Sequence, residues 1–574
     1  MASIIDLLSD PIMEVITDQL GEDVAGDPKN LRVNPTTNPK FGDYQFNGAM
    51  GLAKRLGRSP GELAQELAAR LEGMPWVDRV EVAGPGFVNL WLSNRWLSER
   101  TGGVAQDERI GVERPGREQT VVIDYSSPNV AKPMHIGHIR STILGSALDR
   151  IHRFLGYRVV GDNHIGDWGT QFGILLVAYR RFGNPEALER DPIEELERVY
   201  VEGYQKAQQD PSLMEEARQE LVRLQQGEPA NRKLWEQFVQ ASLNEFDKIY
   251  ERVGVSFDVT LGESFYNDRL QALVDELEQK GIASRSDGAL VVFLEEEGLP
   301  PFIIQKSDGG FNYATTDIAA IRYRIERWQP SKILYVTDEG QQLHFRQLFA
   351  VARRMGIQVE LEHIWFGVMR LPEGKFSTRD GNVIRLDTFM DEAERKAYDV
   401  AHRLNPGLDE GLKREIARKV GLGAIKYADL SQNRQSTVLF TWEKALSLEG
   451  NSAPYLQYTY ARIQSVFRKY REEYGGKEFL GLPLVLEEDT EQQIAKRILE
   501  FPDFLSRSAG TYKANQLTDY LFDLASLFNR FYQNVPFLKA PDGVRESRLV
   551  LCDLVGRIIQ TGLDLLGIEV PDRM

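Results

Sequence analysis

The sequence contains one cysteine, Cys552, among 574 residues. This excludes an internal disulfide framework and a zinc site built from cysteines. Histidine is also scarce, with seven residues, and no stretch reaches the run of about 20 apolar residues that a membrane span needs. The first residues lack the basic start and the small-residue cleavage site of a secretory signal, so we expect a cytoplasmic protein without a membrane partner.

Acidic residues outnumber basic ones, 85 to 69, and the formal net charge is −16. This balance argues against a protein that coats nucleic acid without selectivity, because attraction to phosphate over the whole surface is absent. It does not exclude a structured RNA, which local basic patches and stacking aromatics can hold. With 42% hydrophobic residues and a length typical of about three or four domains, the chain has ample material for hydrophobic cores.

Two of the seven histidines, His135 and His138, lie in the stretch VVIDYSSPNVAKPMHIGHIRSTILGSAL, residues 121–148. This stretch predicts a buried strand, a turn, and a helix whose first turn contains Pro133. At this spacing the imidazoles share nearly one face of the helix N-terminus, beside free backbone N–H groups. Gly137 lowers helix stability and favours a flat group approaching the backbone. We therefore predict a polyphosphate site, against the alternative of capping or core histidines.

The segment SPNVAKPMHIGHIRST resembles the HIGH motif of class I aminoacyl-tRNA synthetases, in the form that arginyl-tRNA synthetases carry. The resemblance implies that the substrate ATP binds at His135, Gly137 and His138, with both histidines taking part in catalysis. It also implies Mg²⁺ as a metal that accompanies ATP. We predict no metal ligands among the protein side chains.

The segment KFSTR, residues 375–379, stands where class I synthetases carry the KMSKS loop. By this resemblance Lys375 is catalytic, and Lys375 and Ser377 bind ATP. Thr378 replaces the second lysine of the motif, so a cation that this chemistry uses is missing. Lys132 is our candidate for the replacement, because it lies three residues before His135 and carries a long flexible stem.

Residues 313–317, YATTD, open a predicted helix on which Tyr313 and Asp317 share one face. Spacing alone favours Asp317 as a helix cap. The segment, however, resembles the one by which arginyl-tRNA synthetases hold arginine, and a fixed carboxylate recognises a planar guanidinium through paired hydrogen bonds. The resemblance adds Asn129, Asn163 and Gln341 as arginine-binding residues. We leave His164 out of catalysis as a turn residue.

Segments at both ends of the chain resemble tRNA-binding parts of the same family. NPKFGDYQFNGAMGLAKRLG and EVAGPGFVNLWL match the N-terminal domain that contacts the tRNA elbow, and ALSLEGNSAPYLQYTYARIQSV, YLFDLASLFNRFYQNVPFL and the terminal LGIEVPDRM match the anticodon-binding domain. The alternative for each aromatic is core packing. The residues that the resemblance marks as tRNA-binding are Phe87, Asn89, Tyr455, Tyr458, Tyr532 and Met574.

The expected architecture is a Rossmann-like, doubly wound α/β catalytic domain between two others. We expect an N-terminal α+β domain over residues 1–112, the catalytic domain over 118–390 with a charged helical insertion at 184–260, and an all-α helical bundle over 395–574. The expected function is a monomeric arginine–tRNA ligase with arginine, ATP and tRNA(Arg) as partners. The alternatives are an H-x-G-H nucleotidyltransferase that does not use tRNA, and a catalytically silent tRNA-binding paralogue.

Overall fold

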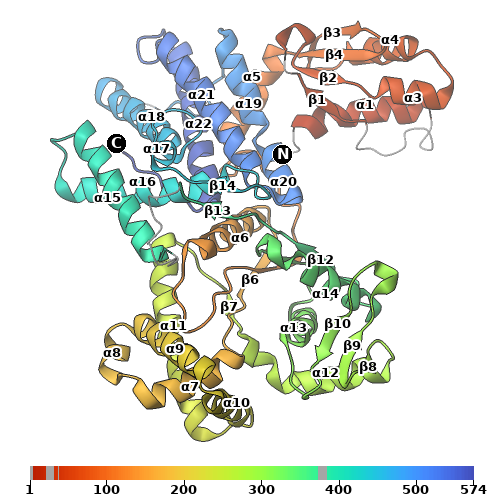
Figure 1. Ribbon diagram of the computed structural model, residues 1–574. Coiled ribbons are helices and arrows are strands. Elements are labelled where there is room, and N and C mark those ends of the chain that lie inside the picture. Colours follow the sequence, from red (N-terminus) through yellow and green to blue (C-terminus); the bar gives the residue numbers. More distant parts are fainter. Residues whose placement is uncertain (1–3, 21–30, 37, 373–383, 477) are drawn as a thin grey trace. The chain divides into compact units, whose positions relative to one another are not determined.

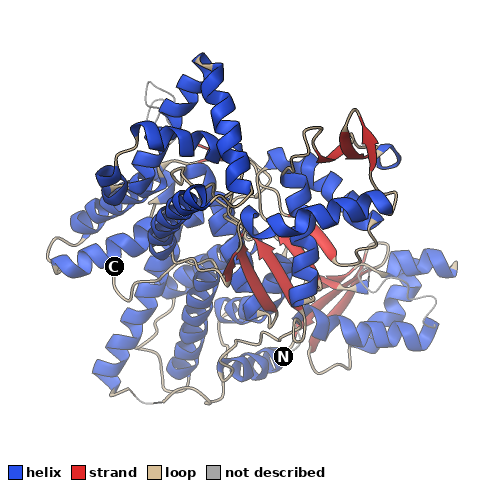
Figure 2. Ribbon diagram, turned by 90° about the horizontal axis from the view of Figure 1, so that it is seen from below, coloured by secondary structure: helices blue, strands red, loops and turns tan. Residues whose placement is uncertain are grey.

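The computed structural model describes residues 4–20, 31–36, 38–372, 384–476 and 478–574. The chain packs as two compact units: the first comprises Met1–Arg114, Leu448–Asp564 and Glu569–Met574, and the second Pro115–Ser447 and Leu565–Ile568. Most of the described chain is helical, and its strands gather into a few small sheets (Figure 2).

The second unit is built on a five-stranded parallel sheet with the strand order β12-β11-β5-β6-β7. Strands β6, β7 and β12 of this sheet are labelled in Figure 1. Val121, Val122 and Ile123 of β5 are all fully buried, as is typical of a parallel strand covered on both faces. From β5 the chain continues to β6 on one side, and later returns to β11 on the other, so the strand order reverses between β5 and β11. Ligands bind at such a switch point. The strands are β5 Thr120–Asp124, β6 Arg158–Asn163, β7 Val259–Thr260, β11 Lys332–Tyr335 and β12 Glu360–His363.

Helices α6, α13 and α14 carry side chains toward the carboxyl edge of this sheet. Ile318 and Ile321 of α13 and Leu348 and Val351 of α14 pack on the sheet in one hydrophobic core, which fixes both helices. A small antiparallel sheet, β10-β9-β8, joins the same core. The bounds are α6 Ile136–Phe154, α12 Asn267–Gln279, β8 Ser284–Ser286, β9 Ala289–Val292, β10 Phe302–Gln305, α13 Tyr313–Trp328 and α14 Gln342–Arg354.

Helices α7 to α11 pack around a core that contains Phe172 and Phe238. Of these, α8 to α11 fall within the range 184–260 that we expect for the helical insertion, and α7 precedes it. Four of these helices begin with a capping side chain followed directly by proline, as in Asp191–Pro192. The cap accepts a backbone N–H of the first turn, and proline suits that turn because it lacks an N–H of its own. The bounds are α7 Thr170–Phe182, α8 Pro185–Arg190, α9 Pro192–Gln209, α10 Pro211–Gln225 and α11 Pro229–Val253.

Helices α15 to α17 also belong to the second unit, although they fall largely within the range 395–574 that we expect to form the C-terminal domain. One contact that joins them to the rest of this unit is a buried ion pair, in which Nε of Arg140 on α6 lies 2.6 Å from Oδ1 of Asp429 on α16. The bounds of the three expected domains stay a prediction. The elements are β13 Met369–Arg370, α15 Leu386–Leu404, α16 Glu410–Leu430, β14 Val438–Leu439 and α17 Trp442–Ala445.

The first unit combines a four-stranded antiparallel sheet, β1-β2-β4-β3, with the C-terminal helices. Tyr44 of β2 is buried and donates its hydroxyl to Glu500 at 3.0 Å, which ties the sheet to these helices. No helix in the described part of the chain has the length and apolar character of a membrane span. The bounds are α1 Ile4–Leu20, β1 Val33–Pro35, β2 Tyr44–Phe46, α3 Ala49–Leu56, α4 Pro60–Leu71, β3 Val77–Ala83, β4 Phe87–Leu92, α5 Asn94–Ala105, α18 Ala453–Tyr474, α19 Asp489–Leu499, α20 Phe501–Thr511, α21 Asn515–Asn534 and α22 Val544–Leu565.

Candidate active site

Helix α6 begins with a reciprocal cap made by the two predicted histidines. His135 is the N-cap residue, and its Nδ1 accepts the N–H of Gly137 at 3.0 Å, while Nδ1 of His138 accepts the N–H of His135 at 3.1 Å. A neutral imidazole that accepts at Nδ1 carries its proton on Nε2. Both rings therefore keep an Nε2–H donor for an anion. The helix starts after Pro133, not around it as predicted, because His135 supplies the cap.

The two histidines are held in the neutral form. Burial lowers the pKa of His138 to about 4, and the charges of His135 and Lys132 add to this shift. Burial also lowers the pKa of His135, and the positive charge of Lys132 lowers it further. A Cβ atom at position 137 would lie 2.8 Å from the His135 ring, so Gly137 is needed for the ring to fold over the helix start. The site thus offers two neutral donors, with the cation of Lys132 close by.

Lys132 is exposed, and its Nζ lies 5.6 Å from the centre of the Tyr200 ring on α9. Residues 384–386 are hydrogen-bonded through the backbone to the start of α6. Ile136 donates its N–H to the carbonyl of Ile384 at 3.1 Å, and Leu386 donates to that of Met134 at 2.9 Å. The described residues 384–386 are therefore adjacent to the start of α6. Lys375, Ser377 and Thr378 themselves lie outside the described residues.

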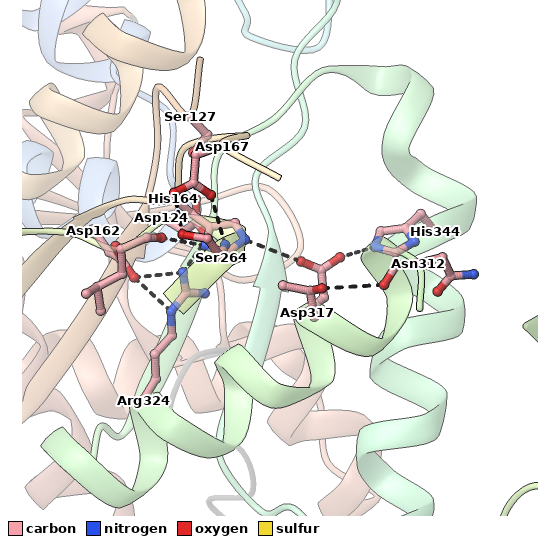
Figure 3. Close-up of polar contacts among 12 residues, drawn as sticks. Asp124, Ser127, Asp162, His164, Asp167, Ser264, Asn312, Asp317, Arg324 and His344 are labelled. Atoms are coloured by element: carbon pink, nitrogen blue, oxygen red, sulfur yellow. Dashed lines mark hydrogen bonds and ion pairs between the residues drawn. The ribbon is translucent and has the colours of Figure 1, made fainter. Parts of the chain in front are cut away.

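A buried arginine lies beneath this edge of the sheet. Arg324 of α13, whose side chain is 1% exposed, lies 2.6 Å from a carboxylate oxygen of Asp124 and 2.8 Å from one of Asp162 (Figure 3). Asp124 is the last residue of β5, and Asp162 is the last but one of β6. Asp124 also accepts the hydroxyl of Ser127 at 3.0 Å, so the ion cluster fixes the turn that leads from β5 toward the histidines. Arg324 is not among the residues that we predicted from the sequence.

Asp317 lies between two histidines (Figure 3). Its Oδ2 is 2.6 Å from Nε2 of His344, and its Oδ1 is 3.9 Å from Nε2 of His164. The N-cap residue of α13 is Asn312, so the capping alternative for Asp317 does not hold. Tyr313 is 61% exposed, and its ring centre lies 4.9 Å from that of His344. Asp317 and Tyr313, which we predicted together, both contact His344.

The surroundings of Asp317 are rich in acidic groups. Burial raises the pKa of Glu263 to about 7, while His164 opposes the shift and Asp317 and Asp167 add to it. Burial acts to lower the pKa of His164. The negative charges of Asp124, Asp317 and Asp162 together outweigh burial, with Asp124 contributing most, and the pKa of His164 is raised. Acidic surroundings of this kind suit a cationic ligand, because a cation beside Asp317 is attracted by the negative charge there.

The other predicted arginine-binding residues differ in exposure. Asn163 is 1% exposed, accepts the N–H of Ser127 at 3.1 Å and donates to the Tyr250 hydroxyl at 3.2 Å, so both ends of its amide support the turn. Asn129 is exposed and pairs through its backbone with Gly166. Gln341 is exposed three residues before His344.

In the first unit, the predicted tyrosines of α18 and α21 converge. The guanidinium of Arg462 lies 4.8 Å from the ring centre of Tyr458 and 5.0 Å from that of Tyr532. Asn529 donates to the hydroxyl of Tyr455 at 3.0 Å. Arg462 and Asn529 were not predicted, although Arg462 follows Tyr458 by one helical turn. Stacked arginine and tyrosine form a surface suited to unstacked bases.

The remaining predicted tRNA contacts lie elsewhere in the first unit. Phe87 and Asn89 are on one face of β4, where Phe87 is partly buried and Asn89 is 2% exposed. The side-chain oxygen of Asn89 accepts from Gln45 at 2.6 Å, so this residue supports the sheet face. The C-terminal tail that ends at Met574 is bonded to α18, where Gln457 donates to the carbonyl of Glu569 at 2.7 Å.

Comparison with known proteins accounts for almost the whole chain. The family model described as the class I tRNA synthetase (R) catalytic domain matches residues 103–442. The chain belongs to the class I arginyl-tRNA synthetase family. Two further family models match the chain. They are the arginyl-tRNA synthetase N-terminal domain at residues 4–92 and the DALR anticodon binding domain at residues 456–574.

Relatives of the family are similar over their full length. The arginine–tRNA ligase of Fusobacterium nucleatum is 46% identical over 549 residues, 95% of this chain and 96% of that protein. The one from Cellvibrio japonicus is 44% identical over 556 residues, 94% of this chain and 95% of that protein. The solved arginyl-tRNA synthetase of Thermus thermophilus superimposes with a TM-score of 0.83 at 26% identity, with complete coverage of both chains.

The prediction of the family, of the fold class and of a synthetase is thereby confirmed, and neither alternative function is favoured. The roles of the individual residues stay predictions.

Proposed function

We propose that this chain joins arginine to tRNA(Arg) in two steps at the carboxyl edge of the parallel sheet. The arginine carboxylate attacks the α-phosphorus of ATP and pyrophosphate leaves. The 2′-hydroxyl of the terminal tRNA adenosine then attacks the carbonyl carbon, and AMP leaves. One observation carries the proposal: a pair of neutral imidazole donors and the carboxylate of Asp317 occupy the same sheet edge, one suited to phosphate and the other to a guanidinium.

For the first step we assign the phosphates to the N-terminus of α6. The Nε2–H groups of His135 and His138 donate to the phosphate oxygens, where charge develops as the fifth bond to phosphorus forms. Neutral donors suit this role, because they bind the anion without the cost of burying a second charge. Lys132, together with Lys375 and Ser377 of the KFSTR segment, supplies the cationic and hydroxyl contacts.

Arginine binds with its guanidinium on Asp317. A carboxylate accepts two parallel N–H bonds from this planar group, an arrangement that rejects an ammonium or a neutral side chain. Tyr313 forms the exposed wall, and we place the substrate α-amino group toward Gln341, with Asn129 at the pocket entrance. Asn163 acts by holding the turn at Ser127 in place.

Mg²⁺ enters this scheme only as part of the substrate. Among the described residues, no three His, Cys, Asp or Glu side chains gather in a way that could hold a metal ion. We therefore place the ion on the ATP phosphates, where it would neutralise charge, and we derive no step from it.

The tRNA contacts are proposed for the first unit. The face of β4 with Phe87 and Asn89 would meet the tRNA elbow. The tyrosines around Arg462, with the tail ending at Met574, would read the anticodon loop by stacking. We propose the domain bounds 1–112, 118–390 and 395–574 for these tasks, with a monomer as the active form.

The test is arginine-dependent exchange between ATP and pyrophosphate, measured with and without tRNA(Arg), followed by tRNA charging. Exchange and charging are the expected result. Exchange without any charging would instead favour a nucleotidyltransferase, and the absence of both would leave a tRNA-binding paralogue.

A further inference from the structure

The carboxylate of Asp317 has a partner that the proposed reaction does not use. Nε2 of His344 lies 2.6 Å from Oδ2, and both side chains are mostly buried, with 11% and 21% exposed. A carboxylate can only accept, so Nε2 of His344 carries the proton in this bond. The contact joins two helices, α13 and α14 (Figure 3).

The ring of His344 is itself held on several sides. Tyr313, Phe302 and Phe345 place their ring centres 4.9, 5.6 and 5.4 Å from it, all in edge-on or tilted contacts. Such packing restricts the rotation of the imidazole, and hence the direction of its N–H bond. The donor is therefore fixed before any substrate arrives.

We propose that His344 is a positioning residue, which sets the plane of the Asp317 carboxylate for the substrate guanidinium. A two-bond guanidinium–carboxylate contact requires the two planes to coincide, and a carboxylate on an unrestrained side chain rotates away from that orientation. Each carboxylate oxygen has two acceptor positions, so the bond from His344 leaves one on Oδ2 and both on Oδ1. On the other side, Oδ1 is 3.9 Å from His164, too far for a direct hydrogen bond. Of the two histidines beside Asp317, His344 is thus the one that orients the carboxylate directly.

This inference rests on the proposed binding of the guanidinium by Asp317. It differs from a purely structural role, in which His344 fills space between aromatic rings. A space-filling residue would affect folding and the affinities of all substrates together. A positioning residue would affect arginine alone, and only while the carboxylate is present.

The experiment is a double-mutant cycle in the full-length chain, with His344→Ala, Asp317→Asn and the combined variant. Exchange between ATP and pyrophosphate is measured with tRNA(Arg) present. We expect His344→Ala to raise KM for arginine about 10–100-fold, in line with the loss of a hydrogen bond to a charged group. KM for ATP should stay within a factor of about two. In the Asp317→Asn background, His344→Ala should add less than a factor of about two.

Two further variants serve as controls. His344→Gln retains an N–H near the position of Nε2, and should recover part of the arginine affinity even if the alanine variant folds poorly. His363 is the matched control, because its Nε2 is also hydrogen-bonded, 2.8 Å from the Thr337 hydroxyl, and its ring packs on Phe345. His363→Gln should leave KM for arginine unchanged.

The outcomes separate the two proposals. Wild-type arginine kinetics in Asp317→Asn would refute the guanidinium site itself. An impaired Asp317→Asn variant with an unaffected His344→Ala variant would overturn the positioning role alone. The same conclusion would follow if His344→Ala raised KM equally in both backgrounds, or if His344→Gln were no better than alanine.

Discussion

His135 has two tasks that different substitutions can separate. Its Nδ1 accepts the N–H of Gly137 as a helix cap, and its Nε2 remains available to a phosphate. The amide oxygen of asparagine can take the position of Nδ1, whereas the longer glutamine places its amide N–H near the position of Nε2. We therefore compare His135→Asn with His135→Gln.

The two variants should fail in opposite ways. Asparagine is among the best N-cap residues, so His135→Asn should keep the stability of α6. It loses the phosphate donor, and kcat for exchange should fall about 10²–10³-fold, as when one transition-state donor is removed. Glutamine caps poorly, and since the cap is exposed the cost should be about 1 kcal/mol. His135→Gln should nevertheless retain more activity than His135→Asn.

The assay is pyrophosphate exchange at saturating arginine and ATP, with thermal unfolding of each variant measured alongside. In a unit of this size, about 1 kcal/mol corresponds to a shift in Tm of about 1–2 °C. If His135→Asn retains the wild-type kcat, His135 is a cap without a phosphate contact. If both variants lose activity in proportion to stability, the separation of tasks is wrong.

Three other predictions concern charge, stacking and pH. Lys132→Ala should lower kcat for activation about 10²–10³-fold, with partial rescue by Thr378→Lys, because the added lysine returns the missing charge; an unchanged kcat with only a salt-sensitive KM would show weak steering. Tyr458→Ala and Tyr532→Ala should each weaken tRNA binding by about 1–3 kcal/mol and leave KM for ATP unchanged; an unaltered tRNA Kd in the folded fraction would indicate core packing. The pKa of His138 is about 4 in the folded chain, against about 6.5 for an ordinary histidine. Below pH 6.5 the unfolded chain therefore binds more protons than the folded chain. The contribution of His138 to stability is therefore present above pH 6.5 and declines as pH falls toward 4, by about 3 kcal/mol, so Tm of a His138→Asn variant should fall less steeply; equal slopes would contradict the assignment.

The sequence predicted the features that depend on neighbouring residues. The run of β-branched residues before the histidines forms β5, and YATTD opens α13, because apolar pattern, turn residues and caps act over a few positions. The family resemblance placed the chemistry on these elements. The helix start was misplaced at Pro133, because the N-cap is a histidine, a residue type with no strong capping preference.

The site could not be completed from the sequence because its supports come from distant positions. His344 meets Asp317 across 27 residues, and Arg324 reaches Asp162 and Asp124 across 162 and 200 residues. No periodicity connects residues this far apart. Only the packing of α13 and α14 on the sheet brings them together.

The cap–proline pairs of the insertion have a consequence for how its sequence can change. Helices α8, α9, α10 and α11 start at four dipeptides, each an N-cap residue followed by proline: Asn184–Pro185, Asp191–Pro192, Asp210–Pro211 and Glu228–Pro229. Exposed positions between these pairs can drift without shifting a helix start, since neither the cap nor the proline depends on them. The insertion can therefore acquire a new surface through point substitutions, while the core around Phe172 and Phe238 keeps its register.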